Sequence, residues 1–235
     1  MLATIFKDKK LTTSADGSII FYSLAYAEAY RAKSIGAYTE SLHKFVKSSG
    51  VLEKTKDRDL RILDLCFGLG YNCAVTFEHA ARVDSTNRVH IVSVEMDAHL
   101  IELVNSLNIL FPVKGYQTVR QCLKEGRSGR FSMEMYNIDA LTAIYNINGH
   151  FDAIYFDPFS ISKNPEMWSV AVFRRLRELL ADDGVLVTYA CGKSARKNMT
   201  EAGLIVEDTA SAVGAFHPGT RARKCSSPPP WGEGK

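Results

Sequence analysis

The sequence has no apolar stretch near the roughly 18 residues that a membrane-spanning helix requires. Its first ten residues also lack the apolar core and small-residue cleavage site of a secretory signal. We therefore expect a cytoplasmic chain without a membrane partner. At 235 residues, with 46% hydrophobic and 23% charged residues, the chain has the composition of an ordinary globular protein.

Cysteines are few and scattered. They form no CxxC pair and no cluster with histidine, and their number is odd; they are Cys66, Cys73, Cys122, Cys191 and Cys225. This pattern favours reduced thiols over disulfides or a zinc site, and we expect no metal. A strong charge imbalance is missing too, because the formal net charge is only +3. Such a charge permits a nucleic-acid partner without requiring one.

Strand-like and helix-like segments alternate from Arg61 onward. Strands are predicted at 62–66, 89–95, 131–136, 151–157, 184–190, 204–207 and near 221–225. Helices are predicted between them at 71–82, 97–107, 116–126, 139–146, 164–181 and 194–202. This alternation predicts an α/β fold with a mostly parallel, seven-stranded sheet covered on both faces.

The N-terminal part precedes this alternation. Residues 11–23 predict a hairpin, and residues 24–49 predict helices with a break at Gly36 and a C-cap at Gly50. Residues 53–59 read as a connector. We expect an N-terminal elaboration over 1–60, a main domain over 61–225 and a poorly ordered Pro-rich tail over 226–235.

The most informative turn is Arg61–Asn72, in which an apolar strand runs into Gly68-Leu-Gly70 and a helix follows. Glycines at such a turn let the backbone pass close to a ligand, and the helix N-terminus offers free N–H groups. A dinucleotide fingerprint needs a third glycine, which is Cys73 here. With Asp64, the pattern Asp-x-x-x-Gly-x-Gly resembles motif I of S-adenosylmethionine (SAM)-dependent methyltransferases.

Two further acids follow the next strands. Glu95 ends the second strand about 25 residues after Gly70, where a carboxylate can accept the hydroxyls of a ribose. The alternative is an exposed loop acid. Asp139 follows the third strand and suits the amino group of adenine, although it also suits a helix N-cap.

The fourth strand ends in Asp157-Pro-Phe-Ser160, which places a carboxylate and an aromatic ring at the carboxyl edge of the sheet. Open α/β sheets bind ligands at that edge. Lys163, Asn164 and Trp168 follow closely. The competing interpretation is a plain turn at Asp157 and a core position for Trp168.

Two strings together identify a family. Leu65-Cys-Phe-Gly-Leu-Gly-Tyr-Asn72 and Asp157-Pro-Phe-Ser-Ile-Ser-Lys-Asn-Pro-Glu-Met-Trp168 resemble the tRNA methyltransferase domain of the MnmC family. The resemblance extends over Ala15–Ser18, Gly36–Ser41, Thr188–Arg196 and Ala202-Gly203, thus over residues 10 to about 225. It departs at 214–220, where the family often has basic residues before a Gly-Thr.

The resemblance implies a Rossmann-like class I fold and methylation of the aminomethyl group of 5-aminomethyl-2-thiouridine at the tRNA wobble position. The methyl donor is SAM. We expect a stand-alone methyltransferase without the family's FAD-dependent oxidoreductase domain. The residues expected at the cofactor are Asp64, Phe67, Gly68, Gly70, Asn72, Glu95, Met96, Asp139, Ala140, Asp157, Tyr30 and Glu40, the last two closing over the site.

Asp157 is the expected catalytic residue. A primary alkylamine is mostly protonated at neutral pH, so Asp157 can orient it and receive its proton. Whether Asp157 acts as a base or as an electrostatic partner stays open at this point.

The expected partner is the anticodon loop of tRNA, with the protein a monomer or weak oligomer. Contacts to RNA are expected from Phe159, Lys163, Asn164, Trp168, Lys193, Arg196 and Lys197. Tyr30 is a further candidate for stacking on a base, and Arg221–Lys224 would extend the basic surface. A solvated helix face is the alternative for Lys193, Arg196 and Lys197. Methylation or aminopropylation of a small amine, and RNA binding without turnover, remain alternative functions.

Overall fold

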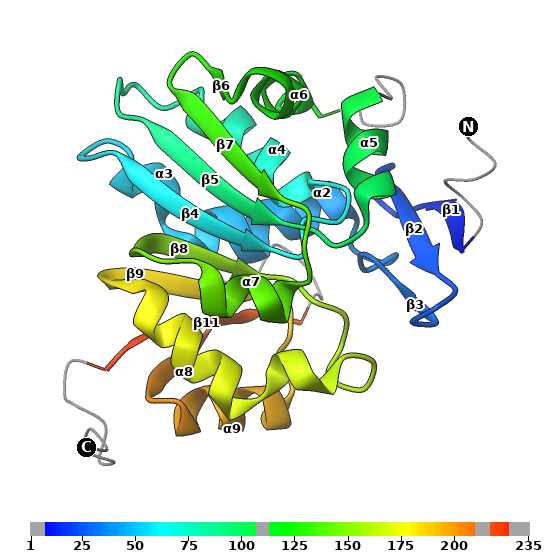
Figure 1. Ribbon diagram of the computed structural model, residues 1–235, viewed down its shortest axis with the longest axis vertical. Helices are drawn as coiled ribbons and strands as arrows, with labels where there is room; N and C mark the ends of the chain where they lie inside the picture. Colours follow the sequence, from blue (N-terminus) through cyan, green and yellow to red (C-terminus); the bar gives the residue numbers. More distant parts are fainter. Residues whose placement is uncertain (1–7, 107–112, 210–216, 226–235) are drawn as a thin grey trace.

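The computed structural model describes residues 8–106, 113–209 and 217–225, and an eight-stranded sheet runs through the middle of this part (Figure 1). The strand order is β10-β11-β9-β8-β4-β5-β7-β6. The parallel strands are β9 (Leu180–Thr188), β8 (Phe151–Phe156), β4 (Leu60–Leu65), β5 (Val89–Val94) and β7 (Phe131–Tyr136). β11 (Thr220–Lys224) pairs antiparallel with β9 and β10 (Leu204–Asp208), and β6 (Arg127–Ser128) pairs antiparallel with β7.

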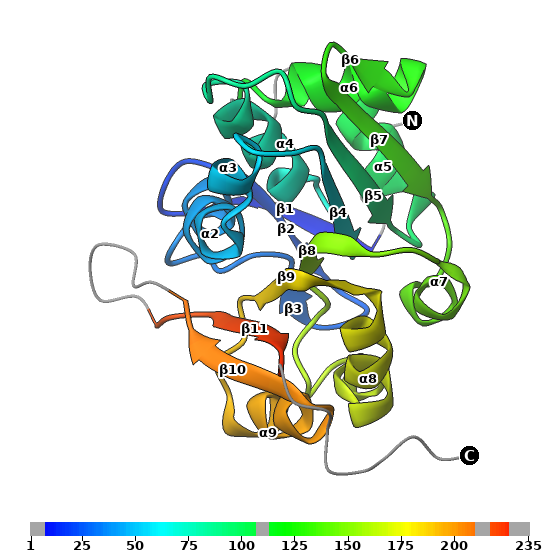
Figure 2. The same cartoon turned by 90° about the vertical axis from the view of Figure 1, so that its left-hand side faces the viewer.

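Helices cover both faces of the sheet (Figure 2). One layer contains α2 (Ala37–Glu40), the π-helical η1 (Ser41–Lys47), α3 (Val51–Lys54), α4 (Tyr71–Ala80), α5 (Ala98–Ser106) and α6 (Tyr116–Glu125). The other contains α7 (Ala140–Asn146), the 3-10 helix η2 (Pro165–Trp168), α8 (Val170–Leu179) and α9 (Lys193–Glu201). The predicted doubly covered, mostly parallel sheet is confirmed.

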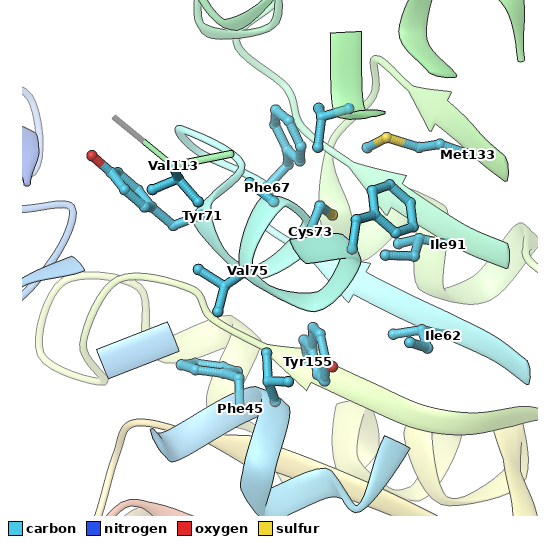
Figure 3. Close-up of a cluster of buried hydrophobic side chains, with 14 of the residues drawn as sticks. Phe45, Ile62, Phe67, Tyr71, Cys73, Val75, Ile91, Val113, Met133 and Tyr155 are labelled. Atoms are coloured by element: carbon cyan, nitrogen blue, oxygen red, sulfur yellow. The ribbon is translucent and has the colours of Figure 1, made fainter. Parts of the chain in front are cut away.

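Each layer has its own hydrophobic core, because successive residues of a strand point to opposite faces. In β4, Ile62 packs into the first core and Leu63 into the second, and both are fully buried. Figure 3 shows the first core, in which Tyr155 from β8 lies between Phe45 from η1 and Ile62 from β4.

The N-terminal hairpin is confirmed: β1 (Lys9–Thr13) and β2 (Ile19–Ser23) pair antiparallel, and β3 (Glu28–Ala29) adds a third strand. The predicted helix over residues 24–35 is wrong. Ser23 Oγ accepts a hydrogen bond from the Tyr26 amide, and Ala27 has a positive φ of 50°. This turn redirects the chain into β3, so tertiary contacts override the helix-favouring composition.

One predicted helix and the predicted number of strands also differ from the structure. Ser169 has extended backbone angles that split the expected helix 164–181 into η2 and α8. The sheet has eight described strands instead of seven, because the two-residue β6 is too short to leave a sequence pattern. Predicted features at residue 107, at 214–216 and in the tail 226–235 lie outside the described residues.

All five cysteines are free thiols. In the described ranges, no helix is long and apolar enough to cross a membrane. The same ranges contain no group of three or more His, Cys, Asp or Glu side chains arranged to hold a metal ion.

Candidate active site

A cavity of about 1060 Å³ opens at the carboxyl ends of β4, β5 and β8. The strand order reverses between β4 and β8, and ligands of open α/β sheets bind at such switch points. The predicted residues that line the cavity are Tyr30, Glu40, Phe67, Gly68, Glu95, Met96, Asp139, Ala140, Asp157, Phe159 and Asn164. The fold therefore brings most of the expected site together.

The loop after β4 is held in a left-handed conformation at Cys66, Gly68 and Gly70. Gly68 lines the cavity, and a hypothetical Cβ there would lie at ordinary van der Waals distance from the Tyr30 ring, at 3.5 Å, and from the Cys66 carbonyl oxygen, at 3.9 Å. Gly70 does not line the cavity. A Cβ there would lie 2.4 Å from the Phe67 ring, so this glycine serves loop packing and not ligand access.

Asp64 was expected at the cofactor, and the structure corrects this. Its side chain is fully buried beneath the loop and does not line the cavity. Asp64 Oδ2 accepts hydrogen bonds from Cys73 Sγ at 3.1 Å and Ser93 Oγ at 3.2 Å. Burial raises the pKa of Asp64. Asp64 therefore ties β4 to α4 and β5, and Cys73, where a dinucleotide fingerprint has glycine, is its donor.

Glu95 lines the cavity and connects two of its backbone segments. Its Oε2 accepts a hydrogen bond from the Gly68 amide at 2.8 Å, and its Oε1 accepts one from the Asp97 amide at 2.9 Å. Each oxygen keeps a lone pair for a ligand hydroxyl. Burial raises the pKa of Glu95, whereas the two amides lower it. Asp139 lines the cavity and also caps α7, accepting from the Thr142 amide at 3.0 Å.

Asp157, directly after β8, has one oxygen fixed by two donors. Oδ2 lies 2.5 Å from Arg31 Nη2 and accepts a hydrogen bond from Asn72 Nδ2 at 3.0 Å. Among the described residues, no donor is hydrogen-bonded to Oδ1, and Asp157 lines the cavity. Asn72, expected at the cofactor, is instead a buried partner of Asp157.

Burial raises the pKa of Asp157 to about 7, against the opposing effect of Arg31, and Glu40 adds to the increase. A carboxyl group that titrates near neutral pH can exchange a proton with an amine. Among the described acids that line the cavity, Asp157 combines an oxygen without a hydrogen-bonded donor with a pKa near 7, and both suit proton transfer.

Sequence reasoning missed Arg31. It follows Tyr30, which the family resemblance placed at the site. Because residues 24–35 were predicted to be helical, the direction of the Arg31 side chain could not be predicted. The only available signal was a basic residue adjacent to an expected site residue.

The turn between β2 and β3, β3 itself and the residues that follow it line one side of the cavity. Tyr26 stacks on Phe159 with ring centroids 4.3 Å apart, and Tyr30 meets Phe159 edge-on at 5.0 Å. Glu28 Oε1 accepts a hydrogen bond from the Ser160 amide at 3.1 Å. These contacts join the N-terminal elaboration to the loop after β8 and bring aromatic rings to the cavity.

Trp168 was expected to contact RNA, and the structure corrects this as well. Its side chain is 0% exposed and packs edge-on against Phe156 in the second core. Its Nε1 donates a hydrogen bond to the Phe159 carbonyl at 2.8 Å. Trp168 therefore supports the position of Phe159 without reaching the cavity.

The expected basic residues separate into two kinds. Lys163 and Lys193 are exposed, whereas Arg196 is ion-paired with Asp208 and bonded to Thr220 Oγ1 at 3.0 Å. Lys197 lies 3.6 Å from Glu201. None of the four lines the cavity, which contains a different exposed lysine, Lys33.

The cavity is rich in acids. Eight of its lining residues are Asp or Glu (Asp8, Glu28, Glu40, Glu95, Asp97, Asp139, Asp157 and Glu166), and three are Lys or Arg (Lys9, Arg31 and Lys33). Such a surplus of negative charge favours cationic ligands.

Comparisons with known proteins agree with this geometry. Residues 83–224 match a family described as S-adenosyl-L-methionine-dependent methyltransferase. The crystal structure of MNMC2 from Aquifex aeolicus is similar with a TM-score of 0.82 and 32% identity, covering 94% of this chain and 72% of that chain.

Two curated relatives carry the same printed description, tRNA 5-methylaminomethyl-2-thiouridine biosynthesis bifunctional protein MnmC. The protein from Azoarcus sp. (strain BH72) is 30% identical over 200 residues, covering 79% of this chain and 31% of that protein. The protein from Burkholderia thailandensis is 28% identical over 240 residues, covering 91% and 36%. This chain thus spans about a third of the length of these relatives.

Proposed function

Because the chain belongs to the S-adenosyl-L-methionine-dependent methyltransferases, we propose that it methylates the aminomethyl nitrogen of 5-aminomethyl-2-thiouridine at the tRNA wobble position. The product is 5-methylaminomethyl-2-thiouridine, and we assign the reaction to the cytoplasm. The observation that carries the proposal is the position of Asp157. It lines a cavity large enough for a cofactor and a base, and its Oδ1 is not hydrogen-bonded to any described residue.

The residues present fit the cofactor. Bound SAM supplies a methyl group on a positively charged sulfur, and the acidic cavity suits that charge. We propose that Glu95 accepts hydrogen bonds from the ribose hydroxyls and that Asp139 accepts one from the adenine amino group. Met96 and Ala140, which lie next to these acids and line the cavity, would contact the rings.

The residues also fit an amine substrate. An alkylammonium group is attracted by the same acids, and Asp157 Oδ1 can accept its hydrogen bond and then its proton. Holding the free amine in line with the methyl group is worth up to about 7–11 kcal/mol in favourable cases. Asp157 adds proton transfer, which typically contributes about 10²–10⁴-fold.

Aromatic rings near Asp157 suit a base that leaves the anticodon stack. Single-stranded RNA bases are usually read by stacking on aromatic side chains. We assign this role to Phe159 and Tyr30, with Asn164 Oδ1, which is buried and without a hydrogen-bond partner in the described residues, as an acceptor for the base.

The function is tested by comparing three methyl acceptors: tRNA carrying the aminomethyl group, the same tRNA without it, and a free small alkylamine. We expect transfer from labelled SAM to the first acceptor only. Equal transfer to the small amine, with or without tRNA, would replace this proposal with small-molecule methylation.

Glu95 gives a prediction about the cofactor. Substituting Glu95→Ala removes the proposed ribose acceptor, and we expect SAM binding to weaken by about 1.5–3 kcal/mol, the scale of charge-assisted hydrogen bonds. Isothermal titration calorimetry measures the change. Glu166→Ala is a control at an exposed cavity acid, and equal affinity of Glu95→Ala and wild type would remove Glu95 from the ribose site.

The exposed lysines give a prediction about RNA. Phosphate contacts make binding depend on salt, and a handful of contacts corresponds to a slope of log K against log[salt] of about −2 to −5. Replacing Lys33, Lys163 and Lys193 together by alanine should flatten this slope much more than it changes SAM binding, because Lys163 and Lys193 lie outside the cavity lining. A triple alanine substitution at Lys47, Lys56 and Lys124, which are exposed and do not line the cavity, serves as the control. An unchanged slope in the first variant would exclude these lysines from the RNA interface.

A further inference from the structure

The Asp157 carboxylate is coupled to a chain of buried charges. Arg31 Nη2 lies 2.5 Å from Asp157 Oδ2, Arg31 Nη1 lies 3.8 Å from Glu40 Oε2, and Glu40 Oε1 lies 3.2 Å from Lys44 Nζ. Arg31 also packs over the Phe45 ring at 5.2 Å. The four charged side chains come from three segments of the chain, and each is at most 11% exposed.

Arg31 is the positive charge that contacts Asp157 directly in the described part of the chain. The other groups with the largest effects on the pair are negative or neutral: Glu40 from α2, Asp64 from β4, Asn72 from α4 and Tyr116 from α6. The positive charge of Lys44 from η1 is paired with Glu40. Cys66 and Tyr189, which also line the cavity, are neutral near pH 7 because burial raises the pKa of each. Without Arg31, Asp157 would face Glu40 and Asp64 in a water-poor site.

We propose that Arg31 is a positioning residue that keeps a large fraction of Asp157 ionised near neutral pH and fixes its Oδ2, so that Oδ1 is available to the substrate amine. Burial disfavours a carboxylate, and an opposite charge at contact distance favours it. Asn72 holds the same oxygen but carries no charge, so it can orient the carboxyl group without keeping it ionised. This inference rests on the proposed methylation, because it assigns a role in that reaction.

The role follows from the proton balance. The amine arrives as an ammonium ion and passes one proton to ionised Asp157 Oδ1. The nitrogen lone pair then forms the new bond to the methyl carbon, and the electrons of the carbon–sulfur bond remain on sulfur. The product leaves as a secondary ammonium ion, and Asp157 returns its proton to water. A protonated Asp157 cannot begin this sequence.

The test is the pH dependence of kcat/KM for aminomethyl-bearing tRNA in the variants Arg31→Met, Arg31→Lys and Glu40→Gln. Wild type should lose activity as the pH falls through about 7, the pKa to which burial raises Asp157. Loss of Arg31 should move this limb upward by about 1–3 pH units, the usual effect of an adjacent opposite charge. Arg31→Lys should restore it in part, and Glu40→Gln, which removes a negative neighbour, should move it downward.

A second readout needs no substrate. The Asp157 carboxyl carbon, labelled with ¹³C and followed by NMR in the protein without tRNA, should titrate at higher pH in Arg31→Met and at lower pH in Glu40→Gln. Arg58→Met, which breaks an exposed ion pair with Asp152, should change neither measurement. If Arg31→Met does not fold, Arg31→Lys and Glu40→Gln still test the direction of the shift.

The outcomes separate the two proposals. If the Asp157 titration moves to higher pH in Arg31→Met and to lower pH in Glu40→Gln, but the protein methylates no tRNA, the role of Arg31 is supported and the proposed substrate is overturned. Activity that falls equally at every pH, with an unshifted Asp157 titration, would show that Arg31 supports structure alone and would overturn the inference.

Discussion

Substituting Asp157→Asn should lower methyl transfer to aminomethyl-bearing tRNA by about 10²-fold or more, while SAM affinity changes little. The amide cannot accept the amine proton, but it has the shape of the carboxyl group and can still contact Asn72 and Arg31. Single-turnover rates measure the effect, because they separate the chemical step from product release.

Raising the pH should partly rescue Asp157→Asn, because a larger fraction of the amine is then free without a protein acceptor. Wild type should lose activity below about pH 7, as Asp157 becomes protonated, and should depend less on pH than the variant above that value. The matched control is Asp152→Asn, an acid in β8 outside the cavity, which should keep the wild-type rate. A wild-type rate in Asp157→Asn would reduce Asp157 to a turn residue.

Substituting Trp168→Ala should destabilise the protein by about 3–5 kcal/mol, the range for removing a large aromatic side chain from a core. Trp168 packs against Phe156 and Phe173, with ring centroids 5.0 Å and 6.3 Å apart. Equilibrium unfolding in urea measures the free energy of unfolding directly.

An exposed aromatic residue provides the comparison for Trp168. Tyr145 on α7 is 55% exposed, and its replacement by alanine should change the free energy of unfolding by no more than about 0.5 kcal/mol. If Trp168→Ala is equally mild but abolishes tRNA binding, the original expectation of an RNA contact is right and the core assignment is wrong.

The sequence predicted those parts of the site that lie on regular elements. Glu95, Asp139 and Asp157 each follow a buried strand, and the carboxyl ends of parallel strands meet at one edge of the sheet. Their convergence could therefore be read from the positions of the strands. The class of enzyme, the cofactor and the α/β fold were predicted from the same pattern and the family resemblance, and the comparisons confirm them.

The sequence could not predict what depends on side-chain direction. Asp64 sits in the expected motif, yet it points beneath the loop to Cys73 and Ser93. Arg31 reaches Asp157 from a segment that follows the left-handed Ala27 and β3, where a helix was predicted. Neither orientation follows from periodicity, since both depend on contacts between segments far apart in the chain.

The most direct test of the central claim is to incubate the protein with methyl-labelled SAM and tRNA that stops at the aminomethyl stage, and then to analyse its nucleosides by mass spectrometry. The account predicts that the label appears in 5-methylaminomethyl-2-thiouridine from the wobble position and that Asp157→Asn strongly reduces it. Label in another nucleoside, or no label in tRNA from a folded protein that binds SAM, would contradict it.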